Sequence, residues 1–176
     1  MKKFCKGLFI PIVLGLVCSL AGVGSSSDQT GKSMIYVLTD RNITEDMDVN
    51  TINSRNQLGD WWEGDLSNVL TRRGGYEARQ IQKSEEFVAG PDAYLLTAKI
   101  ASYNPGSKAA RILIGFGAGA CSMDLHVELF GADNIQIFTK DDHVASSRDW
   151  KYVARKLNEN ILQAVNEALH ADEVKS

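Results

Sequence analysis

The residues that most suggest chemistry are three alternate glycines, Gly115, Gly117 and Gly119, in the stretch RILIGFGAGACSMDLHVEL at residues 111–129. Glycine loops that bind dinucleotide phosphates have the spacing GxGxxG and lead into a helix. Here the spacing is GxGxG, and the following SMDLHVELF alternates with period two, which predicts a strand. We therefore expect no nucleotide or other cofactor, and interpret the glycines as a bend or bulge between two strand segments.

A second group of residues has side chains that can bind metal ions. His126 and Glu128 share one face of the predicted strand, and Asp141, Asp142 and His143 are expected in a loop. Their spacing matches no recognised zinc motif, and His and Asp residues beside a turn are usually solvated. No metal site is therefore predicted.

Cys121 is a candidate nucleophile if a histidine approaches it. A single cysteine that follows a glycine run in a strand is more often a small buried apolar residue. No triad or nucleophile-elbow motif accompanies it. The sequence therefore assigns no catalytic residue, and we expect no enzyme.

The remaining candidates are surface residues. Trp61 and Trp62 are adjacent, so on a helix one enters the core while the other lies near its edge, where it anchors a partner or covers the core margin. Lys108 and Arg111 flank the glycine bend, where they contact an anionic group or protect a strand edge. The candidate interaction residues are Trp61, Lys108, Arg111, Gly115, Gly117 and Gly119.

The hydrophobic pattern predicts an α/β domain of the α+β kind, with a small mixed sheet and two main helices packed on it. Residues 40–56 have no clear period and are expected to form a long loop or a poorly formed helical entry. Ser146 or Ser147 is expected to cap the second helix. Strands are predicted at 34–38, 77–82, 93–103, 122–130 and 135–139, and helices near 58–73 and 148–169.

The N-terminus has the order of a bacterial export signal, with Lys2, Lys3 and Lys6 before an apolar run at residues 8–20. We expect a signal peptide at 1–22, a linker at 23–33, one domain at 34–170 and a tail at 171–176. Cleavage changes the formal charge from −3 to about −6, and such an acidic domain with no basic run is not expected to bind nucleic acid.

The stretch AYLLTAKIASYNPGSKAARILIGFGAGACSMDLHVELF, at residues 93–130, resembles a bacterial envelope family classed as domain of unknown function 4410. The resemblance implies an exported α/β module, and many members of that family are lipoproteins. Here Leu20, Ala21 and Gly22 are followed by Val23 instead of the cysteine that receives lipid. We therefore expect cleavage that releases a soluble periplasmic or envelope-associated protein; retention of the uncleaved helix and lipidation at Cys18 are the alternatives.

These observations lead to three hypotheses of function. The first is a non-catalytic envelope module that binds another envelope protein or component, or assists an assembly. A carrier of a small ligand is the second, and an envelope enzyme that uses Cys121 or the face of His126 and Glu128 is the third.

Overall fold

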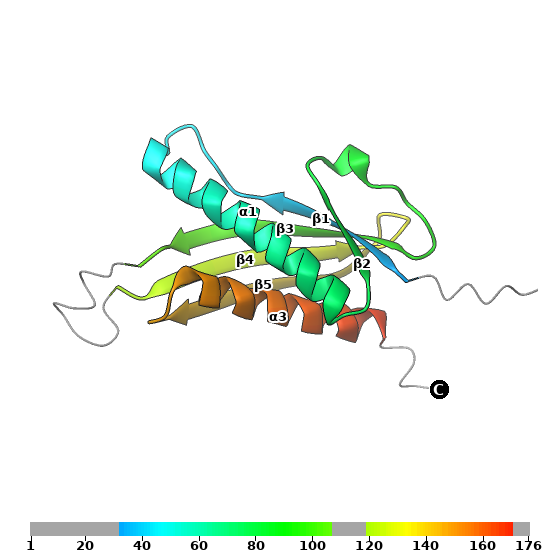
Figure 1. Cartoon of the computed structure of the whole chain (residues 1–176). Helices are drawn as coiled ribbons and strands as arrows, with labels where there is room; N and C mark the ends of the chain where they lie inside the picture. Colours follow the sequence, from blue (N-terminus) through cyan, green and yellow to red (C-terminus); the bar gives the residue numbers. More distant parts are fainter. Residues whose placement is uncertain (1–31, 107–118, 171–176) are drawn as a thin grey trace, which may run out of the picture. The chain divides into compact units, whose positions relative to one another are not determined.

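The alternating apolar segments of the chain form the strands of one mixed sheet. The computed structural model describes residues 32–106 and 119–170, which belong to one compact unit (Figure 1). Five strands lie in the order β2-β1-β3-β4-β5. The elements along the chain are β1 (Met34–Asp40), α1 (Val49–Arg72), β2 (Glu77–Ile81), the 3-10 turn η1 (Ser84–Glu86), β3 (Ala93–Asn104), β4 (Cys121–Phe130), β5 (Gln136–Ser146) and α3 (Trp150–Leu169).

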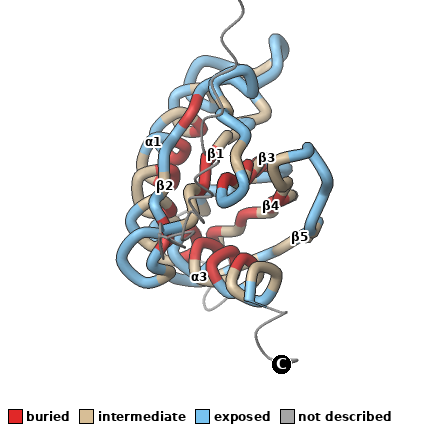
Figure 2. The backbone as a smooth tube through the Cα atoms, turned by 90° about the vertical axis from the view of Figure 1, so that its right-hand side faces the viewer, coloured by how far each residue is buried: buried red, intermediate tan, exposed pale blue. Residues whose placement is uncertain are grey.

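The two halves of the sheet differ in strand direction. β1 runs parallel to both β2 and β3, whereas β3, β4 and β5 are antiparallel to their neighbours. Both helices lie on the same face of the sheet, and α1 connects β1 to the parallel strand β2 (Figures 1 and 2). The predicted mixed sheet with two helices packed on it is confirmed.

The core fills the space between the helices and the sheet. Every second residue of β4 is buried, which is the period expected of a strand with one covered face. Burial of each large apolar side chain contributes about 1.5–3 kcal/mol, so this layer dominates the stability of the fold. The helix residues that complete the core are Leu58, Trp62, Leu66, Leu70, Val153, Ala154, Leu157, Ile161, Leu162 and Val165.

The first helix begins earlier than the sequence pattern predicts. The expected start near residue 58 is wrong, because α1 begins at Val49 and Asp48 caps it by accepting hydrogen bonds from the backbone N–H groups of Asn50 and Thr51. Its first turns are polar because few of their side chains face the core, so they show no apolar period. Of the two interpretations of residues 40–56, the helical entry therefore holds from Val49 on and the long loop only before it.

Two expectations near the C-terminus are also corrected. Asp149 caps α3, since its Oδ1 accepts a hydrogen bond from the Tyr152 N–H at 2.9 Å, and neither Ser146 nor Ser147 occupies the cap position. β5 extends to Ser146, so Asp141, Asp142 and His143 lie on a strand instead of in a loop. The strand continues through these polar residues because Phe138 and Val144 pack against the core on either side of them.

The second face of the sheet is covered in part. Tyr36, Ile81, Ala93 and Leu95 form a small buried cluster on β1, β2 and β3. The ring of Phe87, which follows η1, meets the ring of Tyr36 edge to face with centroids 5.3 Å apart. The neighbouring surface of β3, β4 and β5 on this side carries polar side chains, and we call it the open face. It is defined by Thr97, Lys99, Asp124, His126, Glu128, Asp141 and His143.

Candidate functional site

The open face carries a row of four polar side chains that runs across four strands. Strand register places Asp40, Lys99, His126 and Asp141 side by side. Lys99 Nζ lies 3.7 Å from Asp40 Oδ2, and His126 Nδ1 lies 2.7 Å from Asp141 Oδ1. Cross-strand pairs of this kind contribute roughly 0.2–1 kcal/mol each, so the row orders the side chains without adding much stability.

Neighbouring rows continue this polar network. His126 Nε2 lies 3.9 Å from Glu128 Oε1, so the imidazole stands between two carboxylates. In the next row, Asp124 is hydrogen-bonded to both Ser102 and His143. The hydrogen bonds from Ser102 and then His143 hold the pKa of the Asp124 carboxyl below its usual range. This carboxylate is therefore ionised at neutral pH.

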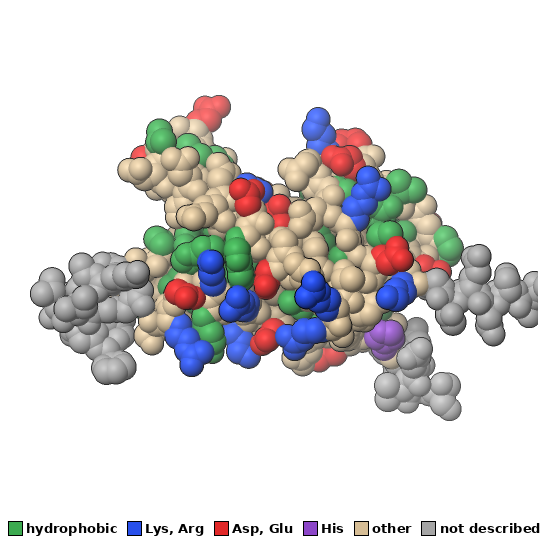
Figure 3. Space-filling model, viewed as in Figure 1, with side chains coloured by type: hydrophobic (Ala, Val, Ile, Leu, Met, Phe, Trp, Pro, Cys, Tyr) green, Lys and Arg blue, Asp and Glu red, His purple; other side chains and the backbone are tan. Residues whose placement is uncertain are grey.

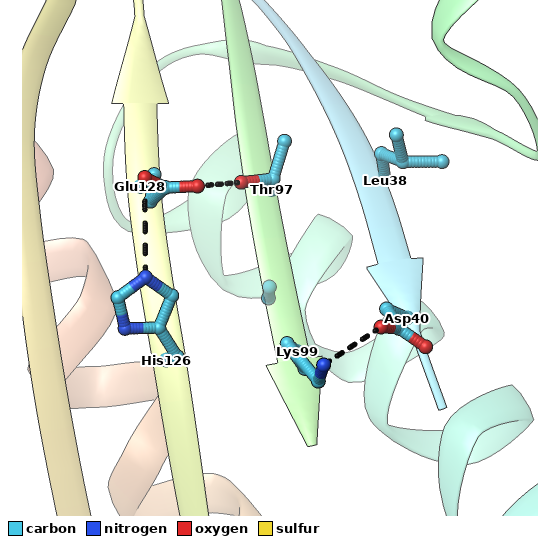
Figure 4. A pocket seen from close by; sticks show the side chains of 7 residues that line it. Leu38, Asp40, Thr97, Lys99, His126 and Glu128 are labelled. Carbon is cyan, nitrogen blue, oxygen red and sulfur yellow. Dashed lines mark hydrogen bonds and ion pairs between the residues drawn. The ribbon is translucent and has the colours of Figure 1, made fainter. Parts of the chain in front are cut away.

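A shallow hollow of about 260 Å³ lies within the open face (Figure 4). Glu128 accepts a hydrogen bond from the Thr97 hydroxyl at 3.4 Å, and Lys99 supplies the ammonium group of the hollow. The arrangement offers one cation, one imidazole and two carboxylates to a polar partner. Its lining residues are Leu38, Asp40, Thr97, Ala98, Lys99, His126 and Glu128.

The structure brings together several of the residues that the sequence singled out. His126, Glu128, Asp141 and His143 share the open face, whereas Asp142 faces α3, where its Oδ2 accepts a hydrogen bond from Asn160 Nδ2 at 2.9 Å. Within residues 32–106 and 119–170, no group of three or more His, Cys, Asp or Glu side chains is arranged to hold a metal ion.

The sequence reasoning missed three charged members of this network, Asp40, Lys99 and Asp124. Asp124 and His126 lie two positions apart on β4, a spacing that places them on one face and that could have been recognised. Lys99 and Asp40 come from other strands, and their proximity depends on the strand order.

Cys121 lies in the core, as the sequence analysis expected. It is fully buried at the start of β4 and belongs to the main apolar cluster. Trp62 is likewise fully buried, whereas Trp61 is half-buried and packs on the margin of the core. The predicted division between the two tryptophans is therefore confirmed.

Trp61 belongs to an aromatic and basic cluster on the helix side of the molecule. Its ring meets that of Trp150 edge to face with centroids 5.4 Å apart. Lys151 Nζ and Arg155 Cζ lie 5.7 Å and 5.4 Å from the Trp61 ring centroid. Lys and Arg side chains surround hydrophobic ones over this layer (Figure 3). These contacts explain Trp61 as a cover for the core and leave its role toward a partner as a prediction.

The glycine region is described in part. Lys108, Arg111, Gly115 and Gly117 lie outside the described residues, whereas Gly119 has a φ of +70° and is followed by β4. The element after the glycines is therefore a strand, as predicted, and not the helix that a dinucleotide loop requires.

The turn that precedes this region also follows the sequence prediction. Gly106 has a φ of +72°, and a Cβ added there would lie 2.5 Å from the Gly119 carbonyl oxygen. A glycine is thus needed at 106 for both its conformation and this close approach.

The fold and the open face define an α+β protein whose five-stranded mixed sheet carries α1 and α3 on one face in the described residues. A family model described as "Domain of unknown function (DUF4410)" matches residues 41–147, more than half of the chain. The protein belongs to this family.

Comparison with solved structures shows a similar fold in a PelC variant dodecamer from Paraburkholderia phytofirmans. The TM-score is 0.54 at 16% sequence identity, with 74% of this chain and 87% of that chain covered. At this identity the likeness concerns the fold alone. No curated protein matches this sequence. Neither α1 nor α3, the helices of the described part, is long and apolar enough to cross a membrane.

Proposed function

We propose that this protein is a non-catalytic module of the bacterial envelope that assembles with further copies of itself. The export part of the proposal rests on the basic N-terminus, the apolar run at residues 8–20 and the polar linker that follows. The non-catalytic part is supported by the burial of Cys121 within the core, where its thiol does not face solvent.

The observation that carries the assembly proposal is the edge strand β5. It has 11 residues and is the last strand of the sheet, so its outer backbone groups have no partner strand in the described part of the chain. Ile137 on β5 and Ile135 just before it are 39% and 66% exposed. A long edge strand with exposed apolar residues is a typical site of strand pairing.

The opposite edge of the sheet supports the same proposal. β2 is the other terminal strand, and it differs from β5 in length and sequence. A contact between two different edges is heterologous, and repeated copies then form a ring if the rotation closes. The similar fold of PelC was found in a dodecamer, which supports an arrangement of repeated copies.

The charged residues of β5 restrict where along the strand this contact can form. Lys140, Asp141, Asp142 and His143 occupy its centre, and charged residues on an edge strand oppose pairing without a complementary partner. We therefore place the self-contact at the N-terminal end of β5, at Ile137 and the preceding Ile135.

Sedimentation of the protein purified from the envelope fraction tests the proposal. We expect a discrete oligomer for the natural protein and a monomer for the Ile135→Lys, Ile137→Lys double variant. Val49→Lys is the matched control, because Val49 is 71% exposed and begins α1, which is on neither edge strand. A monomeric natural protein, or a double variant that retains the oligomer, contradicts the assembly role.

A further inference from the structure

A second hollow, of about 340 Å³, lies between the N-terminal half of α1 and the end of β3. Unlike the hollow of the open face, its lining contains no carboxylate. It is lined by Asn50, Thr51, Ser54, Arg55, Tyr103 and Pro105.

Arg55 is the charged member of this lining, and it is only 8% exposed. Its Nη1 donates hydrogen bonds to the carbonyl oxygens of Arg41 at 2.8 Å and Ile100 at 3.2 Å. Across residues 32–106 and 119–170, it forms no ion pair, and its Nε and Nη2 have no hydrogen-bond partner. Residues 107–118, next in sequence to this end of β3, contain Lys108 and Arg111 but no Asp or Glu.

An arginine that is only 8% exposed and has no carboxylate partner is an unusual arrangement. Buried charges are normally paired, because removal of an ion from water costs several kcal/mol. The two carbonyl contacts compensate part of this cost and hold the group in place. Nε and Nη2 form the edge of the guanidinium that binds a carboxylate or phosphate through two parallel hydrogen bonds.

Tyr103 and Ser54 add a neutral donor beside Arg55. Burial raises the pKa of Tyr103 to about 12, a rise to which Cys121 adds and which a hydrogen bond with Ser54 opposes. The phenol therefore keeps its proton at neutral pH. The backbone N–H groups of Asn50 and Thr51 at the start of α1 are not available to a ligand, because both donate hydrogen bonds to Asp48.

We propose that this hollow binds the oxyanion group of a small ligand, a carboxylate or a phosphate, through Arg55 and through one hydroxyl donor of the hydrogen-bonded pair Tyr103 and Ser54. This site is separate from the self-contact of β5, so either can fail without the other. Binding of an oxyanion is thus a second role of Arg55, besides its hydrogen bonds to the carbonyl oxygens of Arg41 and Ile100.

Nuclear magnetic resonance of the natural chain tests the site with two probes, inorganic phosphate and acetate, at an ionic strength kept constant with chloride. The Nε–H signal of Arg55, assigned by its loss in Arg55→Lys, should shift and saturate with at least one probe. The probe that binds more tightly identifies the oxyanion as phosphate or carboxylate. Equal, unsaturated shifts of all arginine signals would overturn the proposal.

Variants separate binding from the structural role of Arg55. Arg55→Lys keeps the charge but loses the two-donor edge, so binding should weaken by about tenfold or more. Should that variant not fold, Tyr103→Phe and Ser54→Ala each remove one hydroxyl of this pair, and at least one of them should weaken binding about threefold to tenfold. Arg72→Gln, an exposed change at the far end of α1, should leave binding unchanged. Natural affinity in both donor variants would contradict the site.

Discussion

Gly59 lies inside α1 at a point where the helix has no room for a side chain. A Cβ added there would lie 2.5 Å from Arg41 Nε and 2.9 Å from its Cδ and Cζ. Arg41 is held by its Nη2, which lies 2.8 Å from Asp60 Oδ1 and 3.0 Å from Glu63 Oε1. The Glu63 side chain is 9% exposed. We expect Gly59→Ala to displace Arg41 and destabilise the protein.

The magnitude follows from two opposing effects. Replacement of glycine by alanine within a helix adds about 1 kcal/mol of stability. Displacement of Arg41 leaves the buried Glu63 carboxylate without its charged hydrogen-bond partner, which costs roughly 2–3 kcal/mol. The free energy of unfolding should therefore fall by about 1–2 kcal/mol. In the Arg41→Ala background the clash is absent, and the same change should stabilise by about 1 kcal/mol.

Urea denaturation of the four proteins, followed by tryptophan fluorescence, measures this coupling as a double-mutant cycle. The effect of Gly59→Ala should change sign between the two backgrounds. If Gly59→Ala stabilises the natural protein as much as it stabilises Arg41→Ala, then Arg41 moves aside without cost and the reasoning is wrong.

Three further changes test the core, the phenol and the helix cap. Leu129→Ala, at a fully buried position of β4, should lower the free energy of unfolding by about 3–5 kcal/mol in urea denaturation. The pKa of Tyr103 is about 12 in the folded protein, against an ordinary value of 10.0. Between pH 10 and pH 12 the unfolded chain therefore binds fewer protons than the folded one, so the free energy of unfolding falls as the pH rises. Because Tyr103 is partly exposed, we expect the free energy of unfolding to fall by only about 1 kcal/mol over this range. Tyr103→Phe should abolish this part of the pH dependence. Asp149→Ala should cost about 1 kcal/mol, and thermal unfolding should show a smaller effect for Ser146→Ala, because Asp149 holds the cap position.

Elements with a regular apolar period could be predicted from the sequence. The residues of β4 alternate strictly, and those of α3 repeat along one face, because each element has one covered side. The turn at Asn104, Pro105 and Gly106 could also be predicted, because these residue types favour its backbone conformation. In the structure the Gly106 N–H donates a hydrogen bond to Asn104 Oδ1 at 2.9 Å, and Gly106 has a positive φ.

The early start of α1 and the full length of β5 could not be predicted in this way. The first turns of α1 depend on the Asp48 cap and on contacts such as that of Arg55 with the Ile100 carbonyl, 45 positions away. The polar centre of β5 remains a strand because β4 pairs with it and Asn160 of α3 binds Asp142. Both features depend on tertiary partners, which a local pattern does not contain.

A bulge in β3 shows the same dependence at the scale of one residue. Up to Ile100 the even-numbered side chains face the helices, and continued alternation would put Ser102 there and Tyr103 on the open face. The register with β4 shifts between Ile100 and Ser102. Tyr103 therefore packs against the main core, while Ser102 is hydrogen-bonded to Asp124 on the open face.

The bulge also explains why Arg55 lies where it does. The Ile100 carbonyl accepts a hydrogen bond from Arg55 Nη1, and the Ala101 carbonyl accepts one from Asn42 Nδ2 at 3.3 Å. Side chains thus bind the backbone oxygens of both residues at the irregularity, and the one at Ile100 is buried. The same extra residue turns Tyr103 toward the hollow beside Arg55. Since Ala101 is not a glycine and carries no local signal of a bulge, the two groups of the proposed oxyanion site come together only through the pairing of β3 with β4.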